Sequence, residues 1–189
     1  MKVLVACEYS AIVRDAFEFK GHDATSCDIL PCERPYGKHY QGNVLDIIND
    51  GWDLIIAHPP CTFLCNAGLI WLKTETERKQ KQLEAIEFVK TILSADCKRI
   101  CIENPTGVLH VSIGKPSQRV EPWHFGSPYA KDICLWLKNL PLLKQTHFEK
   151  GNKKVKNHTN GRMTQEEKSK IKSRFFPEVA MAMAEQWNF

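Results

Sequence analysis

The sequence has no apolar run that approaches the roughly 20 residues of a membrane-spanning helix. Its first residues, Met1 and Lys2, lead directly into VLVAC, an apolar stretch too short for the hydrophobic region of a secretory signal. It also has no internal repeat, and no low-complexity tract apart from one lysine-rich stretch. These absences predict a cytoplasmic protein without a membrane partner.

Cysteine pairs with the two-residue spacing of zinc sites are missing as well. Eight cysteines are present, and six of them form close pairs with other spacings: Cys27 and Cys32, Cys61 and Cys65, Cys97 and Cys101. In the reducing cytoplasm such thiols stay free, and most behave as small buried apolar side chains. The spacing therefore predicts neither a resident metal nor a disulfide framework.

The composition is that of an ordinary globular protein. The chain has 189 residues, of which 43% are hydrophobic and 25% are charged. This length suffices for one compact domain with a substantial core. We therefore expect residues 1–189 to form a single domain.

The charge is unevenly distributed along the chain. Residues 150–174 carry nine Lys or Arg against two Glu, whereas the whole chain has a net charge of +4. A basic segment on a slightly acidic body suits contact with the phosphates of nucleic acid. The other interpretation is a solvated, mobile loop, and the composition leaves both open.

Apolar runs and helical periodicity alternate along the first half of the chain. Helices are predicted over 10–21, with Ser10 as N-cap, over 74–95, and over 175–187, with Pro177 in the first turn. Strands are predicted over 2–8, 22–30, 53–57, 98–105 and 132–140. Alternation with short connections is typical of an α/β fold with a doubly wound, mostly parallel sheet.

Two prolines and a cysteine follow the apolar strand at 53–57. Proline fixes φ and donates no backbone hydrogen bond, so Pro59 and Pro60 end the strand and stiffen the turn. The carboxyl end of a strand in an open α/β sheet is where ligands bind. The turn is therefore predicted to hold Cys61 in a fixed direction at a site.

Other strands also end in side chains that can carry chemistry. Glu8, Asp28 and Glu103 close the strands at 2–8, 22–30 and 98–105. The carboxyl ends of parallel strands share one edge of the sheet, where an acid after the second strand can bind both hydroxyls of a ribose. A cysteine near an acid can attack an electrophilic ring while the acid supplies a proton.

These motifs resemble those of the DNA cytosine-5 methyltransferases. DLIIAHPPCT at 53–62 is similar to the family's Pro-Cys motif, IENP at 102–105 to its Glu-Asn motif, and FFPEVAMAMAEQW at 175–187 to its final motif beside the cofactor. The likeness spans 3–105 with a weaker echo at 175–187, and is closest to short phage- and prophage-encoded methylase-like proteins. It implies a Rossmann-like S-adenosylmethionine-dependent methyltransferase fold, in a bacterial or infected host cell.

The resemblance assigns catalytic roles. Cys61 would add to C6 of cytosine, so that C5 attacks the methyl group of S-adenosylmethionine, and Glu103 would contact ring N3 and the amino group. Asn104 would hold the Pro-Cys loop, and Arg119 would approach the base. Because the thiolate is the attacking form, we expect Cys61 to be partly ionised at neutral pH, with Arg119 or a helix N-terminus supplying the positive field.

The resemblance also implies a set of cofactor contacts. Asp28 would bind the ribose and Asn43 would lie near the adenine, while Tyr9 would either stack on the adenine or pack in the core. His58 would assist the cysteine or be a hydrogen-bonded loop histidine. The full predicted set for S-adenosylmethionine is Glu8, Tyr9, Asp28, Asn43 and Pro60.

The chain departs from the family pattern in two places. CEYSAIV replaces a glycine-rich turn, and the Cβ atoms of Ser10 and Ala11 restrict φ there. About 70 residues separate Asn104 from the final motif, too few for a target-recognition domain, so sequence-specific reading of duplex DNA would need a partner protein or the basic segment. Three hypotheses follow: cytosine C5 methylation in duplex or single-stranded DNA, modification of a free pyrimidine nucleotide, or binding of nucleic acid or a host factor without turnover.

Overall fold

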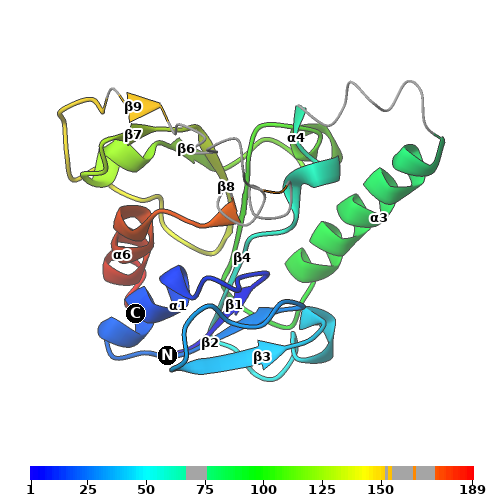
Figure 1. Ribbon diagram of the computed structural model, residues 1–189, viewed down its shortest axis with the longest axis horizontal. Helices are drawn as coiled ribbons and strands as arrows, with labels where there is room; N and C mark the ends of the chain where they lie inside the picture. Colours follow the sequence, from blue (N-terminus) through cyan, green and yellow to red (C-terminus); the bar gives the residue numbers. More distant parts are fainter. Residues whose placement is uncertain (67–75, 152, 155–163, 165–172) are drawn as a thin grey trace.

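The computed structural model describes residues 1–66, 76–151, 153–154, 164 and 173–189. Seven strands form one sheet, in the order β3-β2-β1-β4-β5-β8-β6 (Figure 1). Most of the basic segment at 150–174 lies outside the described residues. The strands are β1 (Lys2–Ala6), β2 (Asp23–Asp28), β3 (Lys38–Gln41), β4 (Leu54–Ala57), β5 (Ile100–Asn104), β6 (Gln118–Val120) and β8 (Ile133–Lys138).

Five of these strands run parallel. β1 pairs with β2 on one side and with β4 on the other, β2 pairs with β3, and β4 pairs with β5. β8 is antiparallel to both β5 and β6. The strand order changes direction between β1 and β4, which is the topological switch point of a doubly wound sheet. The predicted Rossmann-like α/β fold with a mostly parallel sheet is confirmed.

Helices cover both faces of the sheet. α1 (Ile12–Phe19) and α6 (Pro177–Gln186) lie on one face, and α3 (Thr76–Leu93) lies on the other (Figure 1). Successive residues of β4 point to opposite faces, so Ile56 joins the core under α6 and Ile55 joins the core under α3. Within the described residues, no helix has the length and apolar character needed to cross a membrane.

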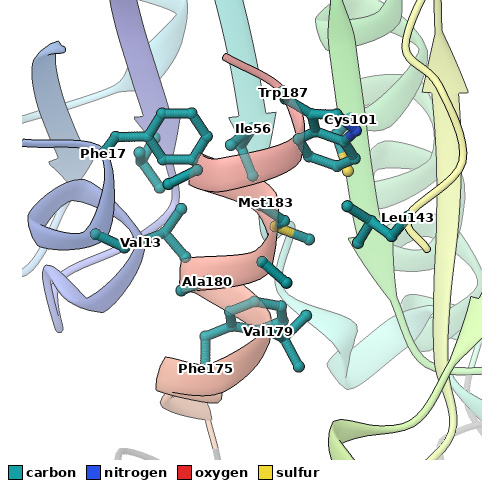
Figure 2. Close-up of a cluster of buried hydrophobic side chains, with 14 of the residues drawn as sticks. Val13, Phe17, Ile56, Cys101, Leu143, Phe175, Val179, Ala180, Met183 and Trp187 are labelled. Atoms are coloured by element: carbon teal, nitrogen blue, oxygen red, sulfur yellow. The ribbon is translucent and has the colours of Figure 1, made fainter. Parts of the chain in front are cut away.

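The C-terminal helix α6 is an integral part of the core. Pro177 stands in its first turn, as predicted, and Val179, Met183 and Trp187 are fully buried. Figure 2 shows these side chains between α1 and the sheet. The Trp187 indole also donates a hydrogen bond to the carbonyl of Pro141 (3.0 Å).

Several elements differ from the sequence prediction. β3 forms within a stretch expected to be a loop, because KHYQ lacks an apolar alternation and only its pairing with β2 makes it a strand. β6 was not predicted, whereas β8 falls within the strand predicted over 132–140. The remaining short elements are η1 (Val44–Asp46), η2 (Cys61–Phe63), α4 (Leu109–Ser112), η4 (Pro122–Phe125), β7 (Tyr129–Ala130) and β9 (Lys153–Lys154).

Candidate active site

A cavity of about 690 Å³ lies at the carboxyl ends of β1, β2 and β4. This position is the switch point of the sheet, and the volume is in the range of small-molecule and cofactor sites. Its walls bring together six of the predicted site residues, Glu8, Tyr9, Asp28, Asn43, Pro60 and Cys61.

Two polar residues, Asp28 and Asn43, line the cavity near the carboxyl ends of β2 and β3. Asp28 ends β2, its Oδ1 accepts a hydrogen bond from Leu30 N (2.9 Å), and burial raises the pKa of its carboxyl. The Asn43 side-chain oxygen accepts a hydrogen bond from Leu45 N (3.1 Å) at the start of η1. Both side chains are thereby oriented by neighbouring backbone, which prepares them to meet a polar ligand.

The turn after β1 takes up a glycine-like backbone without glycine. Cys7 and Ala11 both have φ of 59°, in the left-handed region. This conformation costs an ordinary residue roughly 1–2 kcal/mol. The turn therefore keeps the shape that a glycine-rich loop would have, at the expense of local strain.

Glu8 holds this turn against α1. The residue is 4% exposed, Oε1 accepts from Val13 N (2.7 Å), and Oε2 accepts from Arg14 N (3.2 Å). Burial raises the pKa of Glu8, while the positive charge that His58 carries when it is protonated and the two N–H groups lower it. Glu8, and not the expected Ser10, supplies the acceptor for the first turn of the helix. Both of its carboxylate oxygens therefore already accept hydrogen bonds from the protein backbone.

The Pro-Cys loop is anchored from the end of β5. Asn104 Nδ2 donates to the Pro59 carbonyl (2.8 Å), and Val108 N donates to the Leu64 carbonyl (2.8 Å). A Cβ at Gly107 would collide with the Leu64 carbonyl, so this close approach requires glycine. The loop that carries Cys61 is thus fixed by residues more than forty positions further along the chain.

Cys61 is exposed at the start of η2, yet its surroundings disfavour the thiolate. Desolvation raises the pKa of the thiol most, Cys65 and Glu103 raise it further, and Lys131 lowers it. The direction of this shift runs against the expected partly ionised thiol, and the positive neighbour that lowers the pKa is Lys131, not Arg119. A nucleophilic role requires that Cys61 lose its proton as it attacks.

Glu103 and Arg119 lie differently with respect to this site. Glu103 is next to the last residue of β5 and is not one of the residues that line the cavity, but its charge raises the pKa of Cys61, and its Oε2 lies 3.0 Å from His58 Nδ1. Arg119 is on β6 and does not line the cavity, and its exposed side chain lies 3.5 Å from Asp132 Oδ2. The structure brings Glu103 toward Cys61, while the role of Arg119 at the base stays a prediction.

The segment before α6 completes the cavity wall. Tyr9 Oη and Ser173 Oγ are 3.1 Å apart, and the ring centroids of Phe175 and His58 are 4.8 Å apart. Ser173 and Phe175 were not singled out from the sequence, although the FF pair before Pro177 marks the segment. Nowhere in the described part of the chain do three His, Cys, Asp or Glu side chains gather in a way that could hold a metal ion.

The sequence matches no protein-family model and no curated protein. Among solved structures, it is similar to a mutant of DNMT2 from Spodoptera frugiperda, with a TM-score of 0.43 and 16% identity over 76% of this chain and 52% of that one. It is also similar to the 16S rRNA methylase RmtB, with a TM-score of 0.38 and 11% identity over 72% and 54% of the two chains. A third similar structure is that of WbdD, with a TM-score of 0.40 and 13% identity over 90% of this chain and 47% of that one.

The chain thus spans about half the length of each of these structures. At these scores the likenesses add no argument about activity, and the fold assignment rests on the strand order.

Proposed function

We propose that the protein is an S-adenosylmethionine-dependent methyltransferase that modifies C5 of cytosine in DNA through Cys61. The observation that carries this proposal is the single cavity into which three strand ends bring Asp28, Asn43 and Cys61. A ribose-binding acid, an amide and a thiol at one switch point are the parts that such a reaction needs.

The cavity residues fit the nucleoside part of the cofactor. The Asp28 carboxylate is suited to the two ribose hydroxyls, and the Asn43 amide is suited to the adenine edge. Ile29 and Leu30 add apolar wall beside them. S-adenosylmethionine, when bound, supplies an electrophilic methyl group.

The protein's own residues would then act on the base. Cys61 would lose its proton to water as Sγ forms a bond to C6 of cytosine, which makes C5 nucleophilic. Glu103 would donate a proton to ring N3, where negative charge develops during this addition. After C5 has been methylated, water would take the C5 proton as the bond from Sγ to C6 breaks, N3 would return its proton to Glu103, and the released Cys61 thiolate would take up a proton from water.

The substrate is proposed to be DNA that presents an accessible cytosine. A base in a single strand need not be flipped out of a duplex, so a short chain can reach it without a target-recognition domain. β9 (Lys153–Lys154) belongs to the basic segment at 150–174 and pairs with β7, which directly precedes Lys131. The charge of Lys131 lowers the pKa of Cys61. Cationic side chains in this region would contact phosphates.

A second candidate is a nucleic-acid-binding protein without turnover. The raised pKa of Cys61 favours it, because a thiol that stays protonated is a weak nucleophile. Calorimetry with S-adenosylmethionine separates the two: the methyltransferase binds the cofactor and loses affinity in Asp28→Ala, and the binding protein has no affinity to lose.

The decisive experiment is transfer of a tritiated methyl group to duplex DNA, single-stranded DNA, RNA and dCMP. We expect transfer to DNA by the wild type and a loss of about 10³-fold or more in Cys61→Ser. Cys65→Ser, in the same loop, is the matched control and should retain activity. DNA containing 5-fluorocytosine should form a covalent adduct with the wild type and with Cys65→Ser only.

Two outcomes would overturn the proposal. Transfer to dCMP alone would identify a nucleotide-modifying enzyme. No methyl transfer to any of the four substrates, together with retained binding to DNA, would identify the binding protein.

A further inference from the structure

His58 and Glu103 form a buried pair at the carboxyl edge of the sheet. Ala57 of β4 pairs with Ile102 of β5, so the residues that follow them lie side by side. His58 Nδ1 is 3.0 Å from Glu103 Oε2, and the two side chains are only 10% and 13% exposed. This geometry is a hydrogen bond shielded from solvent, which holds the carboxyl group in one orientation.

The other ring nitrogen of His58 is not explained by packing. Nε2 is buried and has no hydrogen-bond partner in the described part of the structure. The ring lines the cavity and lies against Phe175.

The pairing dictates where protons reside. An ionised carboxylate only accepts hydrogen bonds, so the Nδ1 of a neutral His58 carries the ring proton and Nε2 carries none. This tautomer also leaves Nε2 without a proton that would need an acceptor, which matches its unpartnered state. With Oε2 accepting from Nδ1–H, a proton taken up by Glu103 is directed to Oε1.

Oε1 is the atom that the proposed reaction needs. Among the described residues no other hydrogen bond to the Glu103 carboxyl is present, so Oε1 has no partner among them. The charge of Glu103 raises the pKa of Cys61, so the carboxyl lies within electrostatic reach of the attacking thiol, although Glu103 is not one of the residues that line the cavity. A proton on Oε1 can pass to ring N3 as Sγ bonds to C6, and the carboxylate that remains keeps the hydrogen bond from His58.

We infer that His58 is a positioning residue for Glu103, which it holds by Oε2 so that Oε1 carries the proton toward the base. This inference rests on the proposed function. His58 itself does not exchange a proton with the substrate in this scheme. Its contribution is to fix the orientation and the protonated oxygen of Glu103.

The kinetic test compares three variants in the methyl-transfer assay. His58→Phe keeps the ring volume and removes both nitrogens, and we expect kcat to fall about 10²-fold with KM for DNA changed less than about 3-fold. His58→Asn places an amide donor near the position of Nδ1 and should restore kcat to within about 10-fold of the wild type. His22→Phe is the control: His22 also has an unpartnered buried Nε2 and lies against an aromatic ring, that of Phe17, and this variant should match the wild type.

A readout independent of activity keeps this inference separable from the proposed function. The ¹⁵N chemical shifts of His58 should show a protonated Nδ1 and a bare Nε2, and Glu103→Gln should shift the Nδ1 signal while the His22 signals stay in place. A protonated Nε2, or an Nδ1 signal that ignores Glu103→Gln, would overturn the inference even in a protein without methyl-transfer activity. Full kcat in a folded His58→Phe would overturn it in an active one, while the proposed function would stand.

Discussion

Two turns at the same edge of the sheet line the cavity, and they are fixed in opposite ways. The turn from Cys7 to Ala11 holds its shape from within: two residues are left-handed, and Glu8 ties them to α1. The turn at Pro59 and Pro60 has an unstrained backbone and is held from outside, by Asn104 and the chain around Gly107.

Because of this difference, substitutions in the two turns should have different effects. Strain in the first turn lowers the free energy of unfolding, so substitutions between Cys7 and Ala11 should mainly alter the stability of the whole fold. The second turn depends on the 104–108 segment, so changes in that segment should move Cys61 without touching it. Three substitutions test this contrast, each with a matched control.

Gly107→Ala should have the largest effect. A methyl group there meets the Leu64 carbonyl, so the two backbones must separate, and we expect unfolding free energy to fall by about 3 kcal/mol. Gly51 has φ of 75° and open space around it, so Gly51→Ala measures backbone strain alone, about 1 kcal/mol.

Denaturant unfolding gives both values, and iodoacetamide labelling reports the position of Cys61. Equal losses in the two variants, with unchanged labelling of Cys61, would mean that the external anchor is unimportant.

Ala11→Gly should have an intermediate effect that isolates the strain of the first turn. Relief of the left-handed strain offsets the lost methyl contact, so we expect a change in unfolding free energy of less than about 0.5 kcal/mol. Ala16, in the middle of α1, is similarly buried, and Ala16→Gly should lose about 1–1.5 kcal/mol. If thermal denaturation gives the same loss for both, Ala11 is not strained.

Lys131→Gln should have the smallest effect. Because the pKa of the Cys61 thiol is raised, its alkylation rate should keep climbing as the pH increases past 9, since the thiolate fraction grows over that range. Removing the Lys131 charge raises this pKa further, so labelling at pH 8 should slow by about 2-fold, and Lys115→Gln should leave it unchanged. Faster labelling in Lys131→Gln would contradict the electrostatic assignment.

Strands could be predicted from the sequence where their own residues form an apolar run. The apolar runs of β1, β4 and β5 are buried on both faces, so they could be predicted, and the resemblance correctly linked Asn104 to the Pro-Cys loop. β3 could not be predicted, because its four residues form a strand only through pairing with β2.

The electrostatics of the site were also inaccessible from sequence. The pKa of Cys61 depends on desolvation and on Cys65, Glu103 and Lys131, and folding brings Glu103 and Lys131 from two other segments to the loop that carries both cysteines. The sequence leaves His58 either assisting the cysteine or serving as a loop histidine, because nothing local reveals that β5 pairs with β4 and brings Glu103 beside it.

The cavity wall at Ser173 and Phe175 has a consequence for the order in which the protein is made. All seven strands of the sheet have left the ribosome's active centre once Lys138 is added, yet α6 and the segment before it follow later. At about 5–20 residues per second, the nascent sheet waits roughly 2–10 seconds for Trp187. During that interval Val13 and Ile56 lack the cover that α6 gives them, and the site has no complete wall. A ligand that needs this wall can therefore be bound only after Ser173 and Phe175 have been added to the chain.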